Sequence, residues 1–226
     1  VTFKSHRVDK EGFDHFMLKE IHDTGYAIRQ VCLASNLQYQ KLAQAITRAN
    51  QVYTIGSGTA GLAAAQIAYC LRTHAHINAI SLIGAEAQSY FDLFTSKDLI
   101  LAPSQSGETA DVLEVLEIAK QKGVKIASFV NMPGSMITRL SDYPFMANAG
   151  PEMCVMSTKI FVAQIAWGYL VAQATAGKLT LGKRKLKAAA LAIDKYLDNK
   201  NNHRLIKSLA KKLTPARDIF LLGKSQ

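Results

Sequence analysis

Residues 99–121 read LILAPSQSGETADVLEVLEIAKQ, and this stretch decides how the chain folds. It opens with an apolar run of strand length and passes through a turn rich in serine and glycine. It then enters a segment whose apolar residues recur at helical spacing. A buried strand, a tight turn and an amphipathic helix make up the repeating unit of α/β proteins. The stretch therefore predicts a strand at 98–104 and a helix at 109–121.

The same unit recurs on both sides of this stretch. Further strands are expected at 52–57, 77–83, 124–130 and 143–147, with helices at 58–73, about 85–94, 135–140 and about 158–176. Strands that are apolar throughout and separated by helices indicate a parallel sheet covered on both faces. We therefore predict an α/β fold, a three-layer doubly wound sandwich of flavodoxin-like type with a five-stranded parallel sheet. Ligands of such sheets bind at the carboxyl ends of the strands.

Helical segments flank the predicted sandwich, which spans residues 51–177. Residues 1–50 are expected to be helical at 13–21 and at 26–50, with a break around Ser35 and Asn36. Residues 178–217 are a basic helical connector that holds twelve Lys and Arg against two Asp, and so carries the whole net charge of +10. The connector is interpreted as a solvated helix face that could meet an acidic surface. Nucleic-acid binding is disfavoured because no base-stacking aromatics or recognised motif accompany the charge.

An internal repeat bears on the domain organisation. Residues 42–56 (LAQAITRANQVYTIG) and 209–223 (LAKKLTPARDIFLLG) share Leu, Ala, Thr, Ala and Gly at a constant offset of 167. The first copy leads into the α/β domain. The second copy therefore predicts that residues 218–226 are the start of a truncated second domain, and that the chain is a fragment of a longer protein. Chance similarity between two short amphipathic segments is the alternative interpretation.

Composition narrows the class of protein. Of the 226 residues, 49% are hydrophobic and 19% charged, which is typical of a globular chain and not of a disordered one. The three cysteines are far apart and have no metal-ligand spacing, so we expect no disulfide framework, no metal and a cytoplasmic location. The most apolar stretch, at 160–176, is interrupted by Gln164 and Gln173 and is short for a membrane span. We expect a soluble protein with no signal segment and no membrane partner.

The turn at 104–109 (SQSGET) is the strongest candidate for a ligand site. Exposed backbone N–H groups and the dipole at the start of a helix attract an anion. Ser104, Ser106 and Thr109 add hydroxyl donors, and Gly107 permits close approach of the backbone. Since the turn contains no lysine or arginine, the expected ligand is a monoester phosphate held by hydrogen bonds. The alternative is that these residues serve only as caps and turn formers.

Two other turns lie at the same predicted edge of the sheet. Residues 56–61 (GSGTAG) match G-x-G-x-x-G, but no acidic residue ends the second strand near Ile83, so we do not assign a dinucleotide site. Ser57 and Thr59 instead offer a second hydroxyl-bearing wall for the same ligand. Ser157 and Lys159 begin the long helix after the fifth strand, on the ligand side. Simple capping and a solvated lysine are the alternative there.

These motifs resemble a known family. Residues 104–111 (SQSGETAD), 56–59 (GSGT) and the AGPE and STK motifs at 149–159 are similar to the sugar isomerase (SIS) domain. Residues 14–22 (DHFMLKEIH) are more specific. They resemble the segment that opens the isomerase half of glucosamine-6-phosphate synthases, also called isomerizing glutamine–fructose-6-phosphate aminotransferases. The resemblance implies an SIS-type fold and identifies the chain as the first of two tandem SIS domains.

The resemblance also implies a function. The family converts fructose 6-phosphate and glutamine to glucosamine 6-phosphate and glutamate, without cofactor or metal. The resemblance implies phosphate contacts from Ser104, Gln105, Ser106 and Thr109. It implies sugar contacts from Thr59 and the backbone near Val155, and Ser57 and Ser157 are further candidates. The catalytic residues are expected in the second SIS domain and the C-terminal tail, so this fragment alone is expected to be inactive. The implied partners are the sugar phosphate, the second SIS domain, a glutaminase domain and a second copy in a homodimer.

The chain departs from the family pattern at some positions. Ala60 stands where the family has a hydroxyl, and residues 85–88 (AEAQ) lack the family's arginine. Two alternatives of the same fold therefore stay open. One is a phosphosugar-sensing regulatory module, and the other is a sugar-phosphate isomerase or deglycase.

Overall fold

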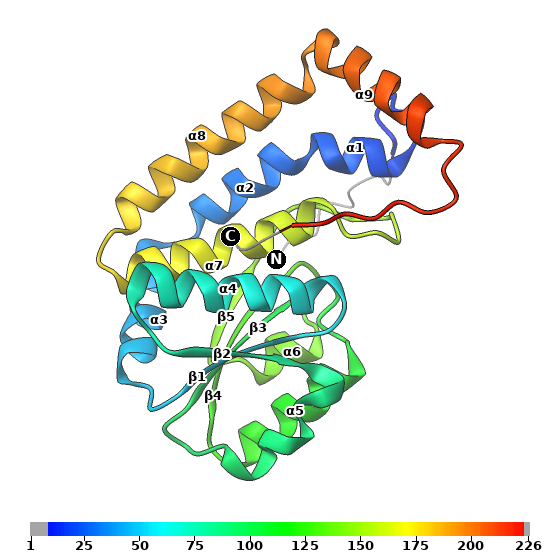
Figure 1. The fold of residues 1–226 in the computed structure, drawn as a ribbon. Coiled ribbons are helices and arrows are strands. Elements are labelled where there is room, and N and C mark those ends of the chain that lie inside the picture. The colour runs from blue at the N-terminus through cyan, green and yellow to red at the C-terminus, as the bar shows by residue number, and fades with distance from the viewer. Residues whose placement is uncertain (1–8, 224–226) are drawn as a thin grey trace.

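The computed structural model describes residues 9–223, and the predicted five-stranded parallel sheet is confirmed (Figure 1). Its strand order is β2-β1-β3-β4-β5, and every neighbouring pair is parallel. In chain order the strands are β1 (Val52–Gly56), β2 (Ala79–Ile83), β3 (Leu99–Ser104), β4 (Lys125–Val130) and β5 (Tyr143–Met146). The two strands that precede the candidate turns, β1 and β3, are therefore neighbours in the middle of the sheet.

Helices cover both faces of the sheet. One face carries α3 (Asn36–Arg48), α4 (Thr59–Ala75) and α7 (Lys159–Thr175), and the other carries the 3-10 helix η1 (Gly84–Leu93), α5 (Ala110–Gln121) and α6 (Met136–Leu140).

Strand β3 shows why the central strands are apolar on both faces. Leu99 and Leu101 join the core that contains Trp167 of α7, whereas Ile100 joins the core that contains Val115 of α5. Successive side chains of a strand point to opposite faces. Both sets are buried here because each face of the sheet has its own layer of helices.

A further group of helices lies outside the α4–α7 layer. It consists of α1 (Phe16–His22), α2 (Thr24–Leu33), α8 (Leu179–Leu197) and α9 (Lys200–Leu213). Helix α2 packs against both α7 and α8. Lys183 of α8 donates to the carbonyl of Ala34 at 2.7 Å, where α2 ends, and a cation stabilises a helix C-terminus. The expected break near Ser35 is confirmed, since α2 ends at Leu33 and α3 begins at Asn36.

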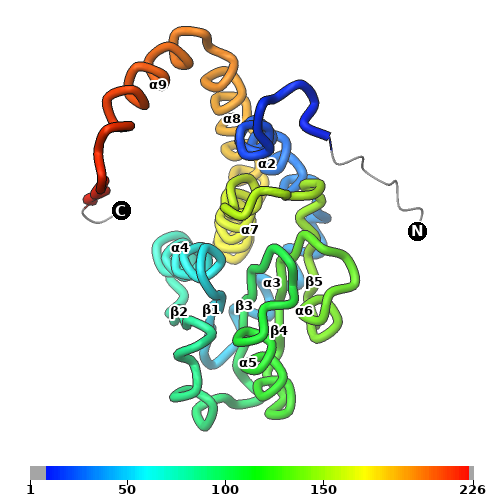
Figure 2. Tube along the Cα trace, turned by 90° about the vertical axis from the view of Figure 1, so that its right-hand side faces the viewer, coloured from blue at the N-terminus to red at the C-terminus, as the bar shows by residue number. Residues whose placement is uncertain are grey.

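Helix α9 follows the far end of α8 and lies apart from the sheet (Figure 2). Its large apolar side chains are 39–66% exposed, namely Leu205, Ile206, Leu209 and Leu213. Residues 218–223 of the predicted second-domain start form no strand in the described chain, and its last residues, 224–226, lie outside the described residues. None of the helices described within residues 9–223 combines the length and the apolar character that crossing a membrane requires.

Candidate functional site

The candidate turns meet at the point where the strand order reverses. The chain leaves β1 for β2 on one side and later returns to β3 on the other side of β1. At such a point the connections diverge and leave a crevice beyond the carboxyl ends of the two strands. Ser57 and Thr59 follow β1, and residues 104–109 follow β3, so the structure brings both predicted groups to the same edge.

The hydroxyls of the turn after β3 accept hydrogen bonds within the turn. Ser104 is buried at the end of β3, and its Oγ accepts the N–H of Gly107 at 2.9 Å. Ser106 Oγ accepts the N–H of Glu108 at 3.2 Å. A hydroxyl that accepts in this way still has its own O–H to donate. The turn is therefore rigid and keeps donors for an incoming acceptor.

Gly107 and Glu108 fasten the turn to the start of α6. The carbonyl of Gly107 accepts the N–H of Ile137 at 3.1 Å, and Glu108 Oε1 accepts the N–H of Met136 at 2.9 Å. Gly107 has φ +70°, and a Cβ there would lie 2.6 Å from Ser135 Cβ. Only glycine fits this backbone without strain. The carboxylate of Glu108 thus has a structural task at a helix N-terminus.

Thr109 stands directly before α5 and has extended backbone angles, φ −70° and ψ 114°. Its carbonyl accepts the N–H groups of Val112 and Leu113, while its hydroxyl makes no capping hydrogen bond within the described chain. The first N–H groups of a helix have no partner inside the helix, and together with the dipole they favour an anion. Thr109 therefore places a hydroxyl beside the amides that open α5.

The turn after β1 presents one of its two candidate hydroxyls to solvent. Thr59, the first residue of α4, is exposed. The Oγ of Ser57 is buried and has no hydrogen-bond partner among the described residues. A Cβ on Gly84 would lie 2.7 Å from that Oγ, so the Ser57 hydroxyl lies against the start of η1. Of the two, Thr59 is the one available to a ligand in this conformation.

The loop between β5 and α7 carries Val155 and Ser157. Val155 is fully exposed, while the Ser157 hydroxyl donates to Glu152 Oε2 at 3.0 Å. Glu152 Oε1 accepts the N–H groups of Thr158 at 3.0 Å and Ile160 at 3.2 Å. Glu152 therefore satisfies N–H groups at the start of α7 from the preceding loop, while Thr158 is the N-cap residue. Because the Ser157 proton is already donated, the remaining capacity of its oxygen is to accept from a ligand hydroxyl.

Lys159 begins α7 after the loop that follows β5, as expected, but the alternative that it is a solvated lysine is wrong. It is 2% exposed, and its Nζ pairs with Asp23 Oδ2 at 2.9 Å. Lys19 pairs with the same oxygen at 2.8 Å. Burial by itself raises the pKa of Asp23, but the hydrogen bonds from the two lysines outweigh it and hold that pKa below its ordinary value.

Asn131, at the end of β4, is a site residue that sequence reasoning missed. Its backbone N–H donates to the carbonyl of Gln105 at 3.2 Å. Its side chain donates to the carbonyl of Gly150 at 2.8 Å and accepts the N–H of Ala149 at 3.2 Å. Asn131 thereby links the turn after β3 to the loop after β5. The available signal was a polar residue directly after an apolar strand.

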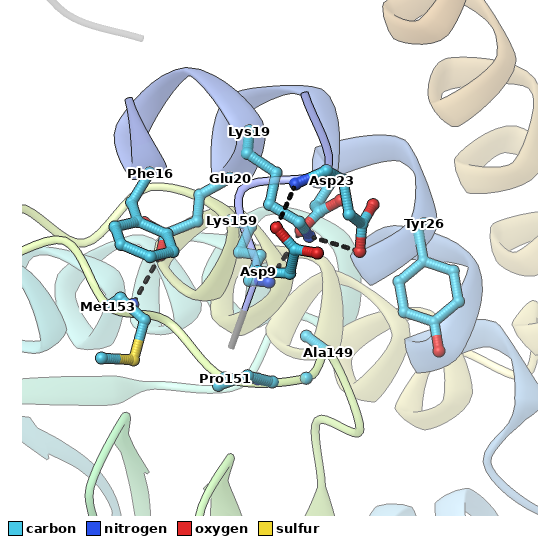
Figure 3. A pocket seen from close by; sticks show the side chains of 12 residues that line it. Asp9, Phe16, Lys19, Glu20, Asp23, Tyr26, Ala149, Pro151, Met153 and Lys159 are labelled. Carbon is cyan, nitrogen blue, oxygen red and sulfur yellow. Dashed lines mark hydrogen bonds and ion pairs between the residues drawn. The ribbon is translucent and has the colours of Figure 1, made fainter. Parts of the chain in front are cut away.

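A cavity of about 270 Å³ lies between α1–α2 and the loop after β5 (Figure 3). Glu20 of α1 and Asp23, which lies between α1 and α2, line it together with Lys159. No group of three or more His, Cys, Asp or Glu side chains within residues 9–223 is arranged to hold a metal ion.

The sequence profile of the SIS domain matches residues 45–174, which is more than half of the chain. The chain belongs to the SIS domain family. The matched region of this SIS domain begins within α3, ends within α7 and includes every turn at the carboxyl edge.

Two relatives of this SIS domain show which enzymes its sequence resembles. The chain is 30% identical to the isomerizing glutamine–fructose-6-phosphate aminotransferase of Pyrococcus horikoshii, over 96% of this chain and 36% of the relative. It is 32% identical to the enzyme of that name from Pyrobaculum aerophilum, over 99% of this chain and 38% of the relative. The chain therefore spans less than two-fifths of the length of these relatives.

The fold of this SIS domain also matches a solved structure. The C-terminal domain of glucosamine-fructose-6-phosphate aminotransferase from Francisella tularensis superposes with a TM-score of 0.64 at 30% identity. The match covers 92% of this chain and 58% of that domain. The expected SIS-type fold and the resemblance to the isomerase half of these enzymes are thus confirmed.

Proposed function

We propose that this SIS domain binds a hexose phosphate, fructose 6-phosphate or glucosamine 6-phosphate, at the carboxyl edge of β1 and β3. The observation that carries the proposal is the turn at 104–109. Its hydroxyls accept hydrogen bonds from its own amides and keep their protons for a ligand, next to the N-terminus of α5. Gln105, Ser106 and Thr109 are half-buried on this turn and would contact the phosphate, with Ser104 beneath them.

The sugar would extend from the phosphate toward the other two turns. Thr59 is exposed at the start of α4, and Val155 is exposed in the loop after β5. The oxygen of Ser157 can accept from a sugar hydroxyl, because its proton is held by Glu152. Ser57 contributes only if its buried hydroxyl turns away from η1 when the ligand binds.

Calorimetry with matched ligands and variants tests the assignment. The native chain should bind fructose 6-phosphate and show no comparable affinity for fructose. Ser106→Ala and Thr109→Ala should each weaken binding about ten- to a hundredfold, because each removes a hydrogen bond to a charged group. Thr73→Ala, which removes an exposed hydroxyl bonded to the carbonyl of Tyr69 in α4, is the control and should bind like the native chain. Unchanged affinity in both turn variants would exclude this location of the phosphate.

We further propose that the chain is the first SIS domain of an enzyme that makes glucosamine 6-phosphate from fructose 6-phosphate and glutamine. The names and identities of the relatives support this. Glutamine hydrolysis would then belong to a separate glutaminase domain, and ring opening and proton transfer to a second SIS domain and the C-terminal tail. The sequence upstream of Val1 in the native gene tests it. A glutaminase domain there supports the synthase, and a helix-turn-helix would instead favour a regulatory module.

The comparison of α9 with α3 supports a second SIS domain beginning at about Asp218. Helix α3 buries four side chains against the sandwich, namely Tyr39, Leu42, Ala43 and Ile46. At the offset of 167 their counterparts on α9 are also apolar, namely Ile206, Leu209, Ala210 and Leu213. All four counterparts are exposed. An amphipathic helix needs a surface for its apolar face. A second sandwich placed on α9 as this one is placed on α3 would supply that surface.

A second copy of the chain is the remaining proposed partner. Large apolar side chains are exposed along the carboxyl edge, namely Leu62, Ile83, Met132, Met153 and Met156. An exposed apolar rim of this kind marks an interaction surface. A homodimer in which another unit covers this rim would bury it, and analytical ultracentrifugation of the full-length protein tests that assembly.

A further inference from the structure

Two carboxylates from the N-terminal helices hold the loop that follows β5. Glu20 of α1 is 1% exposed, and its Oε1 accepts the N–H of Met153 at 2.5 Å and that of Cys154 at 3.2 Å. These groups are more than 130 residues apart in sequence. Figure 3 shows the Glu20 side chain reaching down from α1 to this loop. Hydrogen bonds to a charged acceptor are stronger than neutral ones.

The second attachment is the ion pair of Asp23 and Lys159. Lys159 is the first residue of α7, directly after the loop, and its buried Nζ lies 2.9 Å from Asp23 Oδ2. Lys19 approaches the same carboxylate (Figure 3). Glu11 lies 3.5 Å from Lys19. Lys159 is the buried partner, and loss of Asp23 would leave its charge without compensation, so the pair constrains the start of α7.

The loop depends on these attachments because little else fixes its middle. Residues 147–158 form no helix or strand in the described chain. Met153, Val155 and Met156 are at least half exposed, so the loop has no apolar anchor there. Glu152 and Asn131 hold its two flanks, through the N-terminus of α7 and the carbonyl of Gly150. Met153 and Cys154 are held by Glu20.

The turn at 104–109 does not share these attachments. It is fastened to α6 through Gly107 and Glu108, and to β4 through Asn131. Asn131 joins this turn to the loop only at Ala149 and Gly150, whereas Glu20 holds Met153 and Cys154. A change at Glu20 or Asp23 therefore reaches the part of the loop with Val155 and Ser157 without removing a hydrogen bond of the turn.

We propose that Glu20 and Asp23 are positioning residues that hold the sugar-contacting loop in place. They would thereby determine how much more tightly the site binds a hexose phosphate than phosphate alone. This rests on the proposed function, in which the turn at 104–109 holds the phosphate and the loop after β5 contacts the sugar. Neither carboxylate touches the ligand. Each acts through the backbone and the helix start that it holds.

The test measures two dissociation constants by calorimetry, for fructose 6-phosphate and for inorganic phosphate. Glu20→Ala should raise the first about tenfold or more and change the second less than about twofold, because only the sugar contacts lose their support. Glu20→Gln keeps an acceptor oxygen for both N–H groups. The ratio of its two dissociation constants should therefore be close to that of the native chain. Asp23→Asn should raise the ratio of the fructose 6-phosphate constant to the phosphate constant, as Glu20→Ala does.

Asp98 provides the matched control. It is also a buried carboxylate that accepts backbone N–H groups, from Gln51 at 3.1 Å and Thr95 at 2.8 Å, but at the opposite edge of the sheet. Asp98→Ala should destabilise the fold and leave the ratio of the two constants unchanged. The proposal would be overturned if Glu20→Ala weakened the binding of both ligands equally. It would also be overturned if Asp98→Ala shifted the ratio of the two constants as much as Glu20→Ala does. Either result would mean that Glu20 only stabilises the fold.

Amide hydrogen exchange provides a readout that needs no ligand. In Glu20→Ala the amides of Met153 and Cys154 should exchange faster than in the native chain, while those of the 104–109 turn keep their rate. If Glu20→Ala does not fold, Asp23→Asn is measured in its place at the loop and at the start of α7. Unchanged loop exchange overturns the inference. A native chain that binds no hexose phosphate, with faster loop exchange in the variant, would overturn the proposed function and leave the structural attachment standing.

Discussion

Substitution of Gly107 by alanine is the sharpest test of how the turn after β3 is built. The backbone at this residue has φ +70°, which costs an L-residue roughly 1–2 kcal/mol. The added Cβ would overlap Ser135 Oγ, lie 2.6 Å from Ser135 Cβ and lie 2.9 Å from Val130 Cγ1. Overpacking of this kind costs about 1–3 kcal/mol. We therefore expect Gly107→Ala to lower the free energy of unfolding by about 2–5 kcal/mol.

Urea denaturation followed by circular dichroism measures that loss of stability. Gly134→Ala separates the cost of the backbone conformation from the cost of overpacking. Gly134 also has a left-handed backbone, at φ +76°, but a Cβ there meets nothing within 4 Å. It should lose only the backbone part, about 1–2 kcal/mol. Gly107→Ala should also weaken fructose 6-phosphate binding more than about tenfold, since the amides of the turn must shift. Equal losses of stability in the two variants would refute the packing argument.

Three further outcomes are expected. Hydrogen bonds hold the pKa of Asp142 below its ordinary value of 3.8 despite burial, which by itself raises it, so the ionised form stabilises the fold. Asp142→Asn should lower stability by about 1 kcal/mol at pH 7, and in urea titrations this difference should disappear as the pH falls below 3.8. Trp167→Ala, which removes a buried ring stacked on Phe129, should cost about 3–5 kcal/mol in the same assay, and Trp167→Phe clearly less. The chain alone, supplied with fructose 6-phosphate and ammonia, should form no glucosamine 6-phosphate in a coupled assay. The two carboxylates that could act as a base, Glu108 and Glu152, are both engaged with N–H groups at helix starts. Turnover that disappears in Glu108→Gln or Glu152→Gln would contradict this.

The strands were predictable because each carries its own signal. The five predicted strands coincide with β1–β5 to within two residues at their ends. The largest displacement is at β2, which begins at Ala79 and not at Ile77. There His76 closes α4 in a left-handed conformation, and the N–H of Ile77 donates to the carbonyl of Leu71 at 3.2 Å. Residues used to end a helix in this way cannot also join a strand.

The turns of the site were also predictable from residues close together in the sequence. The hydrogen bonds and ion pairs that Glu20 and Lys159 make were not. Ser104, Ser106 and Gly107 form a motif within four residues, so their spacing already indicates a turn before a helix. The partners of Glu20 and Lys159 lie more than 130 residues away in sequence. A contact of that kind depends on how α1 and α2 pack over the finished sandwich, and no pattern along the chain records it. The burial of Lys159 was therefore missed.

The turn at 104–109 contains no lysine or arginine, and this has a consequence for how the protein would respond to its surroundings. Attraction between exposed full charges is screened by dissolved ions over roughly 10 Å at 0.1 M salt. Hydroxyl and amide donors act only at contact distance and in fixed directions, where no ion can intervene. A site built from them would distinguish its ligand by the tetrahedral placement of the phosphate oxygens. It would keep that discrimination as ionic strength rises, where a cluster of cations would lose affinity for every anion alike.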